Sequence, residues 1–178
     1  MKIFRRICYA LPFYVRQSKG PPGLGAHYAA WCGNIAALES YKSKQSLGPP
    51  KKSKIGDLPT PLHLAVSGEH KKAVEMLLRV DPSAVNASAA VWGDATPLHV
   101  TVFSLDPDML NMLLKAAGNV SRSDFLARTP LHYAAILHNI DALQILIAHG
   151  ASTTARDKSG YTPAHYTVLN GDIEILEI

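Results

Sequence analysis

Cysteine and long apolar runs are the features that this chain of 178 residues most clearly lacks. Its two cysteines, Cys8 and Cys32, are too few for a disulfide framework, and neither belongs to a CxxC pair. A reducing compartment is therefore favoured, and the cytoplasm is the expected location. No uncharged apolar run reaches the roughly 18 residues that a helix needs to cross a bilayer. Because 47% of the residues are hydrophobic, a chain disordered throughout is also excluded.

Charge is distributed unevenly along the chain. Residues 1–58 contain ten Lys and Arg against two acidic residues, whereas residues 59–178 contain eight against twelve. The acidic balance of the larger part argues against nucleic acid as a partner, although the basic part can attract an acidic surface. A lysine-rich run at Lys51, Lys52 and Lys54 is typical of a solvated loop. A nuclear-import signal, and with it a nuclear location, is the alternative interpretation.

A short motif returns at nearly regular intervals. The sequence Thr-Pro-Leu-His occurs three times, a fourth copy has Ala in place of Leu, and a more divergent fifth copy lies upstream. The histidines of these copies are spaced 36, 36, 33 and 33 residues apart; they are His27, His63, His99, His132 and His165. A fixed period in the range of roughly 20 to 50 residues indicates a repeat protein.

Each copy of the motif predicts the start of a helix. Threonine at the N-cap position accepts a hydrogen bond from a free backbone N–H, and proline suits the first helical position because it lacks an N–H. Histidine is then placed to bond back toward the threonine, as in a capping box. A second helix is predicted after each of the three middle copies, because apolar residues such as Val74, Leu77 and Leu78 recur at helical spacing.

These units resemble ankyrin repeats, which are 33 residues long with a TPLHxA signature. The resemblance covers residues 23–178 and implies an all-α fold, an α-solenoid of about five stacked helix pairs with projecting β-turn fingers. The first repeat reads as a degenerate cap and the last as incomplete, which favours a fragment of a longer protein. Glu69, Leu105 and His138 replace the family's glycine between paired helices. A left-handed turn without glycine would cost roughly 1–2 kcal/mol, so we expect these turns to be tightened differently.

Reactive chemistry is not predicted. The five repeat histidines are expected to lie about one repeat apart, roughly 10 Å, which is too far for them to share one metal ion. Cys32 has no base near it in sequence, so a small, turn-filling thiol is favoured over a nucleophile. The chain has no GxSxG, HExxH, P-loop or CxxC motif. We therefore expect no enzyme activity, cofactor, metal site or small-molecule substrate.

Residues 1–22 precede the repeats and form a separate segment. Basic residues near Met1 and a mostly apolar stretch after them resemble a signal peptide in outline, but no clean cleavage site follows. A disordered lead or an extra capping helix is favoured over a short anchor that contacts a membrane.

The surface of the repeats is the predicted site. Partners of ankyrin proteins usually contact the concave face, so the resemblance implies contacts from the ends of the first helices and from the fingers. The implied helix-end residues are unusually apolar: Trp31, Phe103, Ile136, Leu137 and Leu169. The implied finger residues are Trp92, Phe125, Arg128 and Tyr161. An exposed apolar stripe marks an interaction site, but packing of these residues against neighbouring repeats is an equal alternative.

We therefore expect a non-enzymatic adaptor or scaffold that binds another protein, whose identity the sequence leaves open. The alternative is the N-terminal regulatory array of a larger enzyme or membrane protein, such as a palmitoyltransferase, a kinase or a channel.

Overall fold

The computed structural model describes residues 25–42 and 58–171. The predicted lead over residues 1–22 and the lysine-rich run at residues 51–54 lie outside these ranges. Within them the chain is helical, with no β-strand beyond an isolated bridge and no helix that is both long and apolar enough to span a membrane. The chain divides into two compact units. One comprises the residues up to Ala84 together with Ala89–Trp92, and the other comprises Val85–Ser88 and the residues from Gly93 onward.

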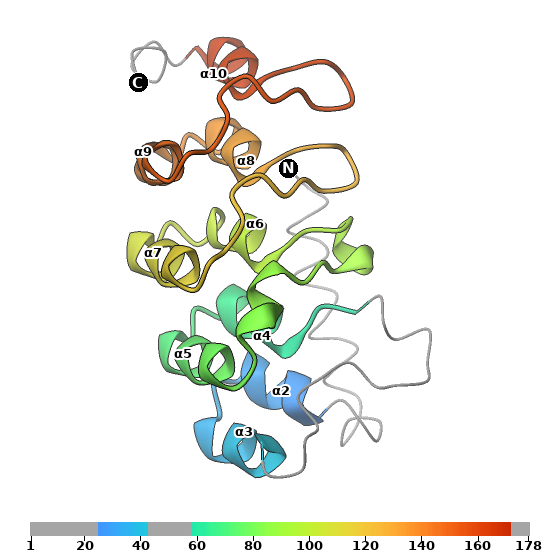
Figure 1. Ribbon diagram of the computed structural model, residues 1–178, viewed down its shortest axis with the longest axis vertical. Coiled ribbons are helices and arrows are strands. Elements are labelled where there is room, and N and C mark those ends of the chain that lie inside the picture. The colour runs from blue at the N-terminus through green and yellow to red at the C-terminus, as the bar shows by residue number, and fades with distance from the viewer. Residues whose placement is uncertain (1–24, 43–57, 172–178) are drawn as a thin grey trace. The chain divides into compact units, whose positions relative to one another are not determined.

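The first unit contains two stacked helix pairs. They are α2 (Gly25–Trp31) with α3 (Ile35–Lys42), and α4 (Pro61–Ser67) with α5 (Lys71–Val80); two short 3₁₀ helices follow, η2 (Pro82–Asn86), which continues into the second unit, and η3 (Ala90–Trp92). The first helices α2 and α4 pack on each other, and so do the second helices α3 and α5 (Figure 1). The side chain of His70 ties the pairs together, since its Nε2 lies 2.8 Å from the carbonyl oxygen of Trp31.

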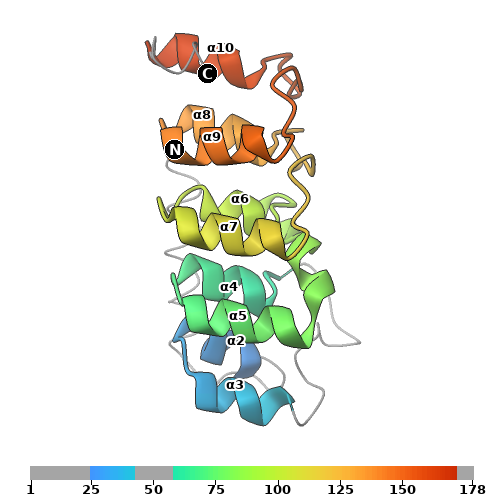
Figure 2. The ribbon, with the colours of Figure 1, turned by 60° about the vertical axis from the view of Figure 1, so that its left-hand side comes forward.

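The second unit repeats the same arrangement. Its elements are α6 (Pro97–Thr101), α7 (Pro107–Lys115), α8 (Pro130–Ile136), α9 (Ile140–Ala148) and α10 (Pro163–Asn170). The first helix α8 packs against both α6 and α10, and the second helix α7 packs against α9. Two long loops project from the same end of these helices (Figure 2). We name them the α7–α8 finger (residues 119–128) and the α9–α10 finger (residues 152–161).

The predicted capping box is confirmed at four first helices. In each, the backbone N–H of the N-cap threonine donates to Nδ1 of the histidine three residues later, over 3.1 to 3.2 Å. The four threonines are Thr60, Thr96, Thr129 and Thr162. The divergent first copy lacks the threonine, and Nδ1 of the buried His27 has no partner within the described residues. The motif therefore does set where these helices begin.

The second helices are also as predicted. Asp106 caps α7 by accepting from the backbone N–H groups of Asp108 (3.0 Å) and Met109 (3.3 Å). The inward side chains of the second helices α5, α7 and α9 are buried, except that of Ile147, which is half-buried. The buried set comprises Val74, Leu77, Leu78, Leu110, Leu113, Leu114, Leu143 and Leu146. Apolar spacing thus identified the core correctly.

One expectation about the turns between paired helices is wrong. Glu69, Leu105 and His138 adopt the left-handed conformation that we expected the chain to avoid, with φ of 58°, 52° and 56°. At Glu69 the reason is visible in the hydrogen bonds that close the preceding helix, because the N–H of His70 reaches back to the carbonyl of Ala65 over 2.9 Å. This closure needs a left-handed residue just before the donor, and it offsets part of the strain.

Candidate partner-binding surface

Exposed apolar side chains gather where the first helices of the second unit end. Phe103, just beyond α6, is 36% exposed, and Leu169, near the end of α10, is 67% exposed. Ile136 and Leu137 lie between them at the end of α8 and are half-buried. Because α8 packs against both α6 and α10, these side chains occur on three neighbouring helices. We call this group the helix-end face.

Asparagine side chains fix the three helix ends relative to one another. The Nδ2 of Asn139 donates to the carbonyl of Val102 over 3.0 Å, and that of Asn170 donates to the carbonyl of Ala135 over 3.2 Å. Asn139 is 7% exposed and also caps α9 by accepting from the N–H of Ala142. Val102 is the C-cap residue of α6 and Ala135 lies in the last turn of α8, where carbonyls have fewer intrahelical donors. The helix-end face is therefore held in a defined arrangement.

Phe103 is in contact with Tyr133. Its ring centroid lies 5.6 Å from that of Tyr133 at a tilt of 49°. An aromatic contact of this kind helps to hold the ring, and the side chain remains 36% exposed. A partly exposed, immobilised aromatic side chain has the properties of an interface anchor.

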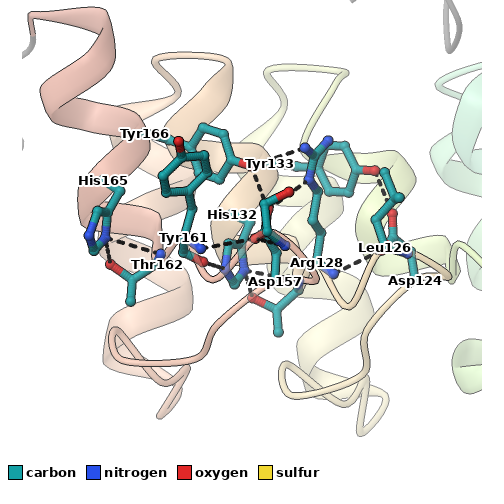
Figure 3. A network of polar contacts seen from close by, with 12 residues as sticks. Asp124, Leu126, Arg128, His132, Tyr133, Asp157, Tyr161, Thr162, His165 and Tyr166 are labelled. Carbon is teal, nitrogen blue, oxygen red and sulfur yellow. Dashed lines mark hydrogen bonds and ion pairs between the residues drawn. The ribbon is translucent and has the colours of Figure 1, made fainter.

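The α7–α8 finger is closed by a carboxylate that sequence reasoning missed. Oδ1 of Asp124 accepts from the backbone N–H groups of Leu126 and Arg128, each at 2.8 Å, and Oδ2 accepts from the hydroxyl of Tyr133 at 2.6 Å (Figure 3). Asp124 is 5% exposed. Burial, followed by the hydrogen bond to Asp124, raises the pKa of Tyr133 above its usual value, so the phenol stays protonated and remains a donor.

The α9–α10 finger contains the same device with one addition. Oδ1 of Asp157 accepts from the N–H groups of Ser159 (2.8 Å) and Tyr161 (3.0 Å), and Oδ2 accepts from the hydroxyl of Tyr166 (2.5 Å). Arg128 of the other finger also reaches this carboxylate, with Nε 3.4 Å from Oδ2 (Figure 3). We call each of the two arrangements an Asp–Tyr clasp.

The contacts of Asp157 stabilise the charged form of its carboxyl group. Burial alone would raise the pKa of this carboxyl, but the hydroxyl of Tyr166 and the backbone N–H groups of Tyr161 and Ser159, helped by Arg128, together lower it. The guanidinium of Arg128 also donates to the Tyr166 hydroxyl over 3.0 Å and lies 5.4 Å from the centre of its ring. Arg128, predicted as a partner contact, is thus engaged in joining two fingers.

The motif histidines link each repeat to the next finger. Nε2 of His99 lies 3.0 Å from the carbonyl of Arg128, and Nε2 of His132 lies 3.2 Å from the carbonyl of Tyr161. A carbonyl can only accept, and the threonine N–H at Nδ1 can only donate, so both rings are neutral with the proton on Nε2. Burial lowers the pKa of His99 to about 4 and lowers that of His132. These histidines are structural, which agrees with the interpretation of the sequence.

Comparison with known families identifies the architecture. A family model described as ankyrin repeats (3 copies) matches residues 26–124, and one described as ankyrin repeats (many copies) matches residues 131–178. The chain belongs to the ankyrin-repeat family. A search of curated proteins found no match to it. Ankyrin repeats are generally modules for protein–protein interaction and are typically non-catalytic.

One residue predicted on the ankyrin surface is buried instead. Trp92 was predicted on a finger surface, but it is 2% exposed and packs edge-on against His63, with ring centroids 5.8 Å apart. The 3₁₀ helix η3 turns its indole inward, so it is a core residue. Cys32 lies in the turn that follows α2, as expected, and its thiol is free and exposed.

The remaining predicted residues divide between the two units. Trp31 is half-buried at the end of α2 in the first unit. Phe125 (52% exposed) and Tyr161 (43% exposed) lie on the two fingers of the second unit. The described residues contain no group of three or more histidine, cysteine or acidic side chains that could hold a metal ion.

The Asp–Tyr clasps had a signal in the sequence that we did not use. An aspartate stands five residues before the motif threonine in two successive repeats, and a tyrosine follows nine residues after each aspartate. The pairs Asp124–Tyr133 and Asp157–Tyr166 are 33 residues apart, the same period as the motif. No periodic pattern points to the asparagines that join the helix ends, because Asn139 and Asn170 occupy different positions in their repeats.

Proposed function

We propose that this chain is a non-enzymatic adaptor that binds another protein through the helix-end face of its second unit. The family supports protein binding in general. The particular surface is supported by the exposure of Phe103 and Leu169 at the ends of α6 and α10, the two helices that pack against α8, because exposed apolar area marks interaction sites.

The mechanism proposed is presentation of a preorganised surface. Helix ends cross-linked by Asn139 and Asn170 have little conformational freedom left to lose when a partner docks. Contacts made there therefore convert more fully into affinity. Phe103, already held by Tyr133, is the side chain that we expect to contribute most.

The experiment removes the apolar side chains of the helix-end face. The double variant Phe103→Ser with Leu137→Ser is compared with the wild-type chain by affinity purification from cell extract and mass spectrometry. Proteins captured by the wild type should be lost with the double variant, while helical circular dichroism and the melting temperature stay nearly unchanged. Ile140→Ser is the matched control, because Ile140 is similarly exposed (38%) but lies at the start of α9.

Two outcomes contradict this proposal. A large fall in the melting temperature of the double variant would assign Phe103 and Leu137 to the core. Equal capture by the wild type, the double variant and the Ile140→Ser control would place the binding surface elsewhere.

A further inference from the structure

Charge is segregated along the second unit. Its described residues from Gly93 onward contain five Lys and Arg, of which four lie on the two fingers: Arg122, Arg128, Arg156 and Lys158. Three of the six aspartates in the same described range, Asp106, Asp108 and Asp141, lie at or just before the starts of α7 and α9. Those helix starts follow the turns at the end of the helices opposite to the fingers (Figure 2).

The two aspartates within the fingers offset only part of the positive charge of the four cations. Asp124 and Asp157 are 5% and 6% exposed, and each is enclosed by its Asp–Tyr clasp. By contrast, Arg122, Arg156 and Lys158 are exposed and have no ion-pair partner among the described residues. The charge that the two fingers present to solvent is therefore positive. Asp94, which precedes α6, is exposed beside Gly93, the residue whose carbonyl accepts from the N–H of Phe125.

The two fingers form one edge of fixed spacing. The backbone N–H of Lys158 donates to the carbonyl of Leu126 over 2.9 Å, and the N–H of Phe125 donates to the carbonyl of Gly93 over 2.8 Å. Hydrogen bonds between successive loops hold their exposed side chains at a constant separation. A linear partner can then be contacted by both fingers at once.

Aromatic side chains accompany the cations on this edge. Phe125 is 52% exposed, and the ammonium of Lys158 lies 6.0 Å from its ring centre. Tyr161 is 43% exposed, and its ring contacts those of His165 and Tyr166. Exposed aromatic rings beside cations provide apolar contact area as well as charge.

We propose that this finger edge, defined by Arg122, Phe125, Arg156, Lys158 and Tyr161, binds an acidic segment of a protein partner that also carries an apolar side chain. The proposal rests on the proposed adaptor function and names the chemistry of its partner. An acidic peptide is favoured over nucleic acid because the described residues from Gly93 onward have six aspartates against five Lys and Arg. A long polyanion requires an extended basic surface, whereas a short acidic segment needs complementary charge only at the fingers.

The test measures binding of a defined probe to the full chain by fluorescence anisotropy. The probe is a short fluorescein-labelled peptide of glutamates with a central leucine, and the same peptide with glutamines is the neutral comparison. The glutamate peptide should bind, more weakly as salt is added, and the glutamine peptide should not. Arg122→Gln with Lys158→Gln should weaken binding about tenfold, since two complementary charges are removed from the contact.

The matched control removes two exposed lysines elsewhere. Lys72→Gln with Lys115→Gln changes the net charge equally but alters helices α5 and α7, so affinity for the glutamate peptide should stay within about twofold of the wild type. Circular dichroism of both double variants verifies that the fold is retained. Equal weakening by the two double variants would show a net-charge effect and overturn the inference. Tighter binding of a single-stranded oligothymidylate than of the glutamate peptide would also overturn it.

Failure here is distinguishable from failure of the adaptor proposal. If proteins captured by the wild type are lost with Phe103→Ser and Leu137→Ser but retained with Arg122→Gln and Lys158→Gln, the adaptor function stands and the finger edge is not its contact. If the glutamate peptide binds at the fingers while no protein depends on the helix-end face, the finger edge stands and the helix-end face is rejected.

Discussion

The two Asp–Tyr clasps of the second unit are built alike and differ in one side chain. In both, an aspartate binds two backbone N–H groups of its own finger and a tyrosine hydroxyl of the helix that follows. Only the carboxylate of Asp157 also has a cation, Arg128, which stands directly before the motif threonine. The preceding repeat has Ala95 at that position, so Asp124 receives no such partner from it.

The difference shows how repeats that share a backbone can differ in robustness. Tyr133 is 6% exposed, so its hydrogen bond to Asp124 is buried. Tyr166 is half-buried, and Arg128 contacts both its hydroxyl and the carboxylate of Asp157. A buried acceptor that loses its donor bears a desolvation cost, while an acceptor with a second donor bears much less. Oδ2 of Asp157 therefore keeps a donor, Arg128, when the hydroxyl of Tyr166 is removed. Oδ2 of Asp124 depends on the hydroxyl of Tyr133 alone among the hydrogen bonds described above.

The largest expected effect is a loss of stability in acid. His99 and Asp157 should lose their contributions to stability in different pH ranges. The folded pKa of His99 is about 4 and its ordinary value is 6.5, so between these values the unfolded chain binds more protons than the folded chain. The free energy of unfolding should therefore fall as the pH drops from about 6.5 to about 4, by on the order of 3 kcal/mol. The folded pKa of Asp157 is lowered below 3.8, so its contribution is present above that value and is lost only at lower pH.

Urea unfolding followed by circular dichroism at a series of pH values measures these two losses. In His99→Gln the dependence of stability on pH in the upper range should become shallower, whatever its effect at neutral pH. Identical slopes for His99→Gln and the wild type between about pH 6.5 and 4 would contradict the assignment. Asp157→Asn should leave the slope in this range unchanged and reduce it below.

A smaller effect is expected from removing each clasp hydroxyl in turn. Tyr133→Phe should lower the free energy of unfolding by about 2 kcal/mol, because the buried Asp124 loses a donor. Tyr166→Phe should cost only about 0.5 kcal/mol, since Nε of Arg128 remains beside Asp157. The two variants are compared by urea unfolding at neutral pH. In an Arg128→Met background the cost of Tyr166→Phe should rise toward that of Tyr133→Phe, and an unchanged cost would show that Arg128 does not provide the redundancy.

An effect smaller than that of Tyr133→Phe concerns the turns that follow α8 and α10, the first helices of the two clasp repeats. His138 follows α8 with φ of 56°, whereas Gly171 follows α10 with φ of 80°. A methyl group at Gly171 would meet no atom of the described residues within 4 Å, so Gly171→Ala tests backbone strain and should destabilise by about 1 kcal/mol. His138→Gly should change stability in the opposite direction by less than that. Thermal unfolding measures both, and a stabilising Gly171→Ala would refute the strain argument.

Much of the fold could be predicted from local sequence. The capping boxes at Thr60, Thr96, Thr129 and Thr162 and the buried second-helix leucines all follow from interactions within one repeat. Such contacts join residues three or four apart, so their spacing appears directly in the sequence. The left-handed conformation of Glu69 and His138 was not predicted because it depends on helix closure, in which the N–H of His70 donates to the carbonyl of Ala65 and that of Asn139 to the carbonyl of Ala134.

The candidate site was predicted less well because exposure is decided between repeats. Phe125 and Tyr161 are exposed on the fingers as predicted, but Trp92 is buried and Arg128 is bound to Asp157 and Tyr166. All four are of residue types that are enriched at protein–protein interfaces. Which of them faces solvent depends on the loop conformation and on the neighbouring finger.

The sequence by itself determined the register of this protein: where each first helix starts, which side chains face inward and how long each repeat is. Those properties arise from hydrogen bonds and apolar spacing within a few residues. Only the tertiary structure decided that Asp124 and Asp157 are withdrawn from solvent while Arg122 and Lys158 remain outside. Burial of a charge depends on donors supplied by a separate helix or finger, and that arrangement exists only once the repeats have packed together.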